Sequence, residues 1–135
     1  MTTESVLLQK HKKLFYGFLV IGPVFFGCFS FPFVNLTHEW SGNLTVLNMF
    51  VFAAAYYNIG LVEAVVFPVN AGVKIILLNL ILTCVGFGCR YLLEYGEVSN
   101  TYNFTIPNVV LHLLVSTAIS TLVWLWNAKK MKNKV

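Results

Sequence analysis

Four long apolar stretches, separated by short polar segments, constrain this chain more than any other feature of its sequence. Each is about 20 residues long, and a helix of that length matches the roughly 30 Å hydrocarbon core of a bilayer. The stretches lie at residues 14–34, 44–67, 73–93 and 107–127. Helices satisfy their own backbone polar groups, which lipid cannot do. We therefore predict an all-α integral membrane protein, folded as an antiparallel bundle of four transmembrane helices.

The composition argues against a soluble protein of the same size. The chain has 135 residues, of which 58% are hydrophobic and 10% are charged, and its mean hydropathy is +0.76. Soluble domains carry about 25% charged residues, and a small domain has too much surface for its volume to hide so many apolar side chains. We expect residues 1–135 to form a single membrane domain, with the lipid bilayer as its main partner.

The lysines lie close to the ends of the chain and at one short turn. The net charge is +4, and the lysines are Lys10, Lys12, Lys13, Lys74, Lys129, Lys130, Lys132 and Lys134. By the positive-inside rule, this distribution predicts that both the N-terminus and the C-terminus are cytoplasmic. No folded basic face exists outside the membrane, so we expect no nucleic-acid partner. The expected location is the plasma membrane.

A polar stripe runs along one face of the third span. Asn79, Thr83, Gly86 and Arg90 follow one another at steps of four, three and four, so they share one side of a helix. The other faces of this span are apolar. Polar groups inside a membrane need protein or water beside them. The stripe therefore indicates the side on which the other helices pack.

Several spans carry glycines, which in membrane helices usually mark close contact between backbones. We expect such contacts at Gly60 on the second span and at Gly86 on the third. Gly22 and Gly27 on the first span can serve the same purpose.

Glu63 is the most informative single residue, because it is an acidic side chain within the second span. It shares a helix face with Tyr56 and Gly60. The tight turn after this span folds spans two and three into an antiparallel hairpin, which places Glu63 level with Asn79, and we predict that these two side chains meet. A charge at the bilayer centre costs about 2.5–3.5 kcal/mol or more, and less near a helix end. Two interpretations stay open: a carboxylate that binds a proton or cation, or one that reaches the membrane interface or pairs with Lys74.

A second polar set lies toward the other membrane face. Arg90 and Glu94 are four residues apart and can pair on the helix surface. A row at steps of four on the fourth span comprises Asn108, His112, Ser116 and Ser120. Because His112 lies at a depth similar to that of Arg90, we predict a polar seam between spans three and four. The seam is either a packing contact between helices or a lined pathway, with Arg90 and His112 as contacts for an anion or a headgroup.

The sequence marks no catalytic residue, cofactor or metal site. The chain contains no aspartate, and its three histidines lie in a tail, a loop and a span. The cysteines, Cys28, Cys84 and Cys89, all fall in apolar stretches. A zinc site would need ligands that converge from distant positions. A lipid-active enzyme therefore ranks behind two other hypotheses.

The first hypothesis is a channel or transporter for an ion or small solute. Its pathway residues would be Glu63, Asn79, Thr83, Arg90, His112 and Ser116. Four short helices make a poor barrier with a pathway, so this hypothesis favours a homo-oligomer whose polar faces meet at its axis or interface. The alternative is a non-transporting accessory, immunity or assembly subunit of a larger membrane complex, in which the same polar faces contact the partner.

Overall fold

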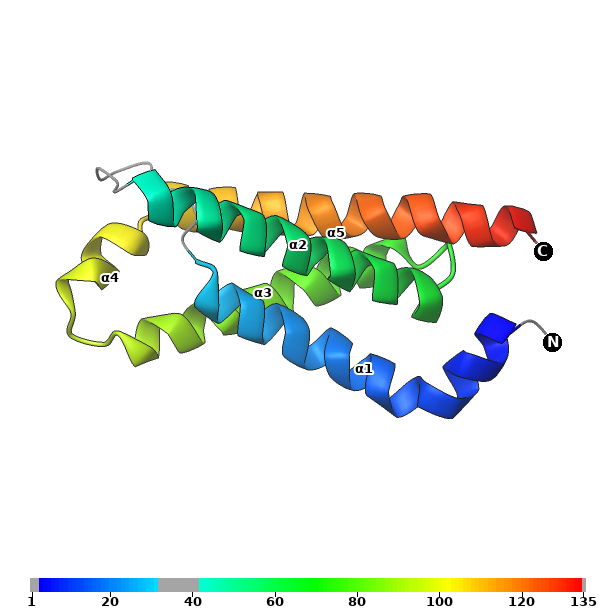
Figure 1. Ribbon diagram of the computed structural model, residues 1–135. Helices are drawn as coiled ribbons and strands as arrows, with labels where there is room; N and C mark the ends of the chain where they lie inside the picture. The colour runs from blue at the N-terminus through cyan, green and yellow to red at the C-terminus, as the bar shows by residue number, and fades with distance from the viewer. Residues whose placement is uncertain (1–2, 32–41, 135) are drawn as a thin grey trace.

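Four long helices and one short helix form a bundle in the part of the chain that the structure describes (Figure 1). The computed structural model describes residues 3–31 and 42–134. The helices are α1 (Thr3–Phe29), α2 (Gly42–Val66), α3 (Gly72–Leu93), α4 (Val98–Asn103) and α5 (Ile106–Lys134). Each of the four long helices contains a stretch of 20 to 28 residues that is long and apolar enough to cross a membrane. The predicted all-α bundle of four long apolar helices is confirmed.

The helix ends differ from the predicted spans by more than two residues in three places. α1 ends at Phe29 rather than at residue 34. The first predicted loop, residues 35–43, lies outside the described residues up to residue 41, and α2 already begins at Gly42. α1 also starts earlier, and the backbone is not helical at His11 (φ −116°, ψ 20°), where the N-terminal turns bend away from the rest of the helix (Figure 1). α5 continues beyond residue 127 to Lys134. Lysine and alanine are good helix formers, and lysines also suit a helix C-terminus.

The short helix α4 lies in the segment for which the sequence predicted only a loop. Gly96 has a φ of +84°, and this left-handed conformation, which glycine adopts without steric cost, turns the chain after α3. The Asn100 side chain then donates hydrogen bonds to the carbonyl oxygens of Tyr91 (3.0 Å) and Glu94 (2.8 Å). These bonds tie α4 to the end of α3.

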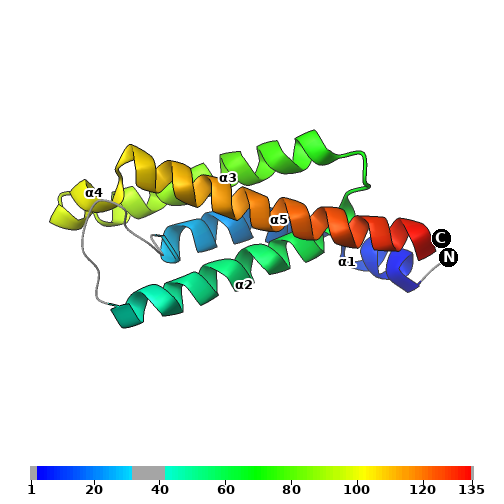
Figure 2. The same cartoon turned by 90° about the horizontal axis from the view of Figure 1, so that it is seen from above.

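The helices do not pair in chain order. α2 packs mainly on α5, and α1 packs mainly on α3, while smaller contacts of α1 with α2 and of α3 with α5 complete the bundle (Figure 2). Both chain ends and the turn between α2 and α3 lie at one end of the bundle, which we call the terminal end (Figure 1). The opposite end, where α4 lies, is the α4 end.

Glycines mark the two closest approaches between helix backbones. A Cβ atom on Gly86 of α3 would lie 2.6 Å from the Val24 carbonyl oxygen of α1, and a Cβ on Gly27 would lie 3.2 Å from the Thr83 carbonyl oxygen. A Cβ on Gly60 of α2 would lie 2.6 Å from the carbonyl oxygen of Ser120 on α5. The predicted close contacts at these three glycines are confirmed. These contacts lie within the two main helix pairs, α1 with α3 and α2 with α5.

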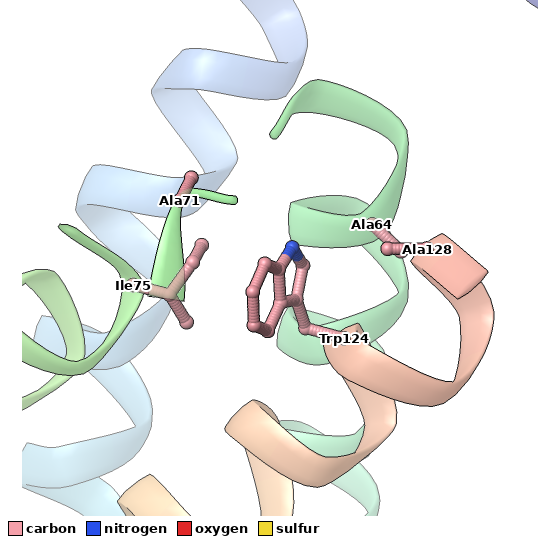
Figure 3. Close-up of a cluster of buried hydrophobic side chains, with 5 residues drawn as sticks. All are labelled: Ala64, Ala71, Ile75, Trp124 and Ala128. Carbon is pink, nitrogen blue, oxygen red and sulfur yellow. The ribbon is translucent and has the colours of Figure 1, made fainter. Parts of the chain in front are cut away.

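A compact apolar cluster surrounds Trp124 near the terminal end. Its buried members are Ala64, Ala71, Ile75, Trp124 and Ala128, which come from α2, the start of α3, and α5. Figure 3 shows the indole ring between the side chains of Ala71 and Ile75 and those of Ala64 and Ala128. The indole nitrogen donates a hydrogen bond to the Phe67 carbonyl oxygen (3.3 Å). This carbonyl lies just past the end of α2, where carbonyls lose their helical partners.

Candidate functional site: a buried polar column

Eight polar side chains from three helices line up inside the bundle, and we call them the polar column. They are Tyr56 and Glu63 from α2, Asn79 and Thr83 from α3, and Asn108, His112, Ser116 and Ser120 from α5, and each is 0% exposed. On α5 alone the column extends from Asn108 to Ser120, roughly 18 Å at 1.5 Å per residue. That is more than half of the roughly 30 Å hydrocarbon core.

Glu63, Asn79 and Ser120 form the part of the column nearest the terminal end. The Asn79 side-chain nitrogen Nδ2 lies 3.1 and 3.3 Å from the two carboxyl oxygens of Glu63. It also donates to Ser120 Oγ at 2.8 Å. The Ser120 hydroxyl in turn donates to the Ser116 carbonyl oxygen (2.9 Å). The predicted meeting of Glu63 and Asn79 is confirmed, and Ser120 joins α5 to them.

The Glu63 carboxyl group has no cationic partner among the described residues. Lys74 is exposed at the start of α3 and forms no ion pair with it. The side chain also does not reach the membrane interface, because it is 0% exposed. The two structural alternatives from the sequence, interface contact and pairing with Lys74, are therefore wrong. Burial of a carboxyl group is costly without compensating bonds, and the hydrogen bonds from Asn79 are the compensation that the structure shows.

Tyr56 and Thr83 form the middle of the column. The Tyr56 hydroxyl and Thr83 Oγ1 are 3.0 Å apart and share a hydrogen bond between α2 and α3. Ser116 of α5 lies beside the same Tyr56 hydroxyl, and its own hydroxyl donates to the Leu113 carbonyl oxygen (3.1 Å). Hydroxyl groups can both donate and accept, so this level can change the direction of its hydrogen bonds.

His112 lies toward the α4 end and is surrounded by aromatic rings. Its Nδ1 atom is 2.5 Å from the Asn108 carbonyl oxygen, one turn earlier on α5. Its ring centroid lies 4.8 Å from that of Phe31, 5.9 Å from that of Phe52 and 6.4 Å from that of Phe87. The polar column is therefore enclosed by apolar rings at this level.

The sequence predicted that Arg90 and His112 belong to one polar seam. In the structure Arg90 bonds to other residues. Its guanidinium group pairs with Glu94 at 2.6 Å, as predicted. It also donates to the Cys28 carbonyl oxygen of α1 at 3.2 Å. Cys28 is in the last turn of α1, and the residue four positions on is Pro32, which has no backbone N–H to offer. Arg90 therefore serves as a cap for α1, and the polar seam between α3 and α5 ends before it.

The polar faces of the spans are directed into one chain and not toward an oligomer axis. All eight side chains of the column are fully buried within the single chain. The homo-oligomer stays a prediction, and burial of these faces does not require one. A single chain supplies every wall of the column.

The oxygen atoms around Glu63 are the groups that could meet a small cation. Within residues 3–31 and 42–134, no three His, Cys, Asp or Glu side chains gather closely enough to hold a metal ion. Three members of the polar column, Tyr56, Asn108 and Ser120, were not among the predicted pathway residues. Arg90 was among them, and in the structure it is not part of the column. Asn108 and Ser120 could have been predicted from the sequence, because they share the row at steps of four on α5 with His112 and Ser116.

Comparison of the chain with models of protein families, with curated proteins and with solved structures returns no match.

Proposed function

We propose that this protein is a small membrane transporter or channel for an ion or small solute, with the polar column as its pathway. The observation that carries the proposal is the fully buried Glu63 carboxyl group, which has no cationic partner among the described residues. Ionisable residues within spans are costly, and they typically mark ion pathways and proton relays. A contact needed only for packing is satisfied by neutral groups such as Thr83 and Ser116, so the carboxyl group calls for a further explanation.

The enclosure at the α4 end favours a carrier over a permanently open channel. The rings of Phe31, Phe52 and Phe87 surround His112, and the column has no exposed member. Passage of an ion along the column needs these rings, or the helices that bear them, to move. Phe31 lies two residues past the end of α1, and a shift of α1 against α3 would open this level.

Flux measurements test the proposal. The purified full-length protein is reconstituted in liposomes under gradients of H⁺, Na⁺, K⁺ or Cl⁻, and ion-sensitive dyes report movement. We expect flux that falls at least tenfold in Glu63→Gln, which removes the ionisable group and keeps the shape. The matched control is Glu97→Gln, because Glu97 is exposed between α3 and α4. Flux in Glu97→Gln should equal that of the wild type.

The same preparation separates the alternative functions. Wild-type liposomes that carry no flux under any of the gradients would overturn the transport proposal, and the accessory, immunity or assembly subunit would take its place. The molecular mass in detergent, measured by light scattering, tests the homo-oligomer. A monomer that supports flux would show that one bundle contains the whole pathway.

A further inference from the structure

We infer that the ligand of Glu63 is a proton, and that the Asn79 amide turns over to accept a hydrogen bond from the protonated carboxyl group. The inference rests on the proposed function, because it names the ion that the polar column takes up. It concerns three fully buried side chains from three helices, Glu63, Asn79 and Ser120.

The Asn79 amide is only half satisfied in the orientation that the structure shows. Its nitrogen Nδ2 has two hydrogens. One is shared between the two Glu63 oxygens, and the other is donated to Ser120 Oγ. Its oxygen Oδ1 is buried and has no hydrogen-bond partner. A buried polar atom without a partner is unfavourable and calls for an explanation. The orientation suits an ionised carboxylate, which only accepts hydrogen bonds.

A half-turn of the amide about its Cβ–Cγ bond creates the opposite pattern with almost no change of shape. Oδ1 then occupies the position of Nδ2, 3.1 Å from the nearer Glu63 oxygen and 2.8 Å from Ser120 Oγ. A protonated carboxyl group can donate to Oδ1, and so can the Ser120 hydroxyl after rotation away from the Ser116 carbonyl. The same three side chains therefore bond to the carboxyl group in both its ionised and its protonated state, and after the turn the amide NH₂ occupies the position where Oδ1 has no partner in the structure.

This arrangement fits a proton better than a metal cation. A hard metal cation needs several oxygen ligands directed at it, typically six or more for calcium. Here the group closest to both carboxyl oxygens is the amide NH₂, which repels a cation, and the Ser120 hydroxyl is bonded to its own helix. A proton needs only one carboxyl oxygen and one acceptor.

Among the described residues, no titratable group other than Glu63 takes part in the hydrogen bonds between Glu63, Asn79 and Ser120. The groups on the surrounding helices that could titrate include Tyr56 on α2, Lys74 and Cys84 on α3, His112 and Lys129 on α5, and Lys13 and Tyr16 on α1. Tyr56 bonds to Thr83, His112 to Asn108, and the Tyr16 ring packs on Phe67. None of them forms an ion pair or hydrogen bond with Glu63. The proton is therefore held between Glu63 and Asn79.

Infrared difference spectroscopy on the full-length protein in liposomes tests this inference directly. Acidification should produce the C=O stretching band of a protonated carboxyl group in the wild type. The band should be lost in Glu63→Gln and kept in Glu97→Gln, and addition of NaCl or KCl should not change it. In Asn79→Leu the band should persist at a higher wavenumber, because the carboxyl group has lost its hydrogen-bond acceptor.

Two outcomes would overturn the proton site, and a third would overturn the turning amide. One is a spectrum in which the wild type and Glu63→Gln give the same bands at every pH, which would mean that Glu63 does not take up a proton. The other is a Glu63 band that disappears when Na⁺ or K⁺ is added at constant pH, which would identify a metal-cation site. A band in Asn79→Leu at the wild-type wavenumber would also reject the turning amide. Each variant is first shown to elute as the wild type does on size exclusion, so that an unfolded protein is not scored.

Spectra and flux report separately on the two proposals. Flux without a Glu63 band leaves the transporter in place and rejects the proton. A Glu63 band without flux keeps the proton site and rejects transport.

Discussion

Asn79 joins α2, α3 and α5 through one amide group, and the sequence predicts half of this connection. Its spacing from Glu63 across a tight turn determines that the two lie level, so their meeting is predictable. To predict the hydrogen bond to Ser120, one must also know which face α5 turns toward α3. The depth of the residues in the membrane does not give this. The same reason explains Arg90 and His112, which lie at similar depth and nevertheless take different partners.

The hydrogen bond between Tyr56 and Thr83 offers a measurable coupling at the middle of the column. The two oxygen atoms are 3.0 Å apart and both side chains are 0% exposed. We expect a double-mutant cycle of Tyr56→Phe and Thr83→Val to give a coupling energy of about 0.6 kcal/mol, the typical size for hydrogen bonds inside membranes. Unfolding in mixed micelles measures it. The exposed neighbour Tyr57, changed to Phe, serves as the control, and a coupling of zero would contradict the bond.

Two tryptophans on one helix differ sharply in their surroundings. Trp124 is 2% exposed and its indole donates to the Phe67 carbonyl, whereas Trp126 is 64% exposed. We expect Trp124→Phe to lower the free energy of unfolding by about 1–2 kcal/mol, because it removes buried area and leaves that carbonyl without its partner. Trp126→Phe should change it by less than about 0.5 kcal/mol. Equal effects in a denaturation series would show that the cluster in Figure 3 is not tightly packed.

Helices as elements are largely predictable from the length of the apolar stretches, and their ends are not. The four spans follow from about 20 apolar residues each. α1 continues on the N-terminal side through a bend at His11, and α5 continues through a basic tail, since helix formers extend a helix into water without any apolar face. The α4 helix is joined to the end of α3 by hydrogen bonds from Asn100. The spacing of apolar residues in the sequence does not predict these bonds.

The glycine contact between α1 and α3 yields a paired test on a single helix. A methyl group on Gly86 would meet the Val24 carbonyl oxygen at 2.6 Å, while one on Gly88 would meet nothing within 4 Å. We expect Gly86→Ala to destabilise the protein by about 1–3 kcal/mol, because the backbones must move apart. Gly88→Ala should leave stability unchanged or raise it slightly, since alanine is the better helix former. Thermal unfolding in detergent compares the two, and an unaffected Gly86→Ala would rule out the close contact.

For the whole molecule, the sequence predicts the four long apolar helices and leaves open which of them touch. All four spans are apolar on most faces, so lipid and neighbouring helices compete for the same surfaces and the pattern does not specify partners. The short turn between α2 and α3 makes them neighbours in the chain, yet each packs mainly on a different helix. Glycines lie where the paired backbones come close, at Gly86 and Gly27 between α1 and α3 and at Gly60 between α2 and α5.

The placement of charge makes a prediction about orientation in the membrane. Both chain ends lie at the terminal end of the bundle, together with exposed lysines such as Lys13, Lys74 and Lys130. The positive-inside rule then predicts that this end is cytoplasmic. A short epitope tag at either terminus should resist an impermeant protease in intact cells and be cleaved after permeabilisation. Cleavage of either tag in intact cells would reverse the predicted orientation.

The pairing of α2 with α5 has a consequence for how the protein is made. A membrane chain is inserted from its N-terminal side, so α2 and α3 enter the bilayer before α5 has been synthesised. Until then the carboxyl group of Glu63 lacks the helix that covers it in the finished bundle. The tight turn delivers Asn79 to it first, and the bond between them can form in the half-built protein. The Asn79 side chain, which we propose turns when Glu63 is protonated in the mature protein, thereby also bonds to that carboxyl group in the nascent one.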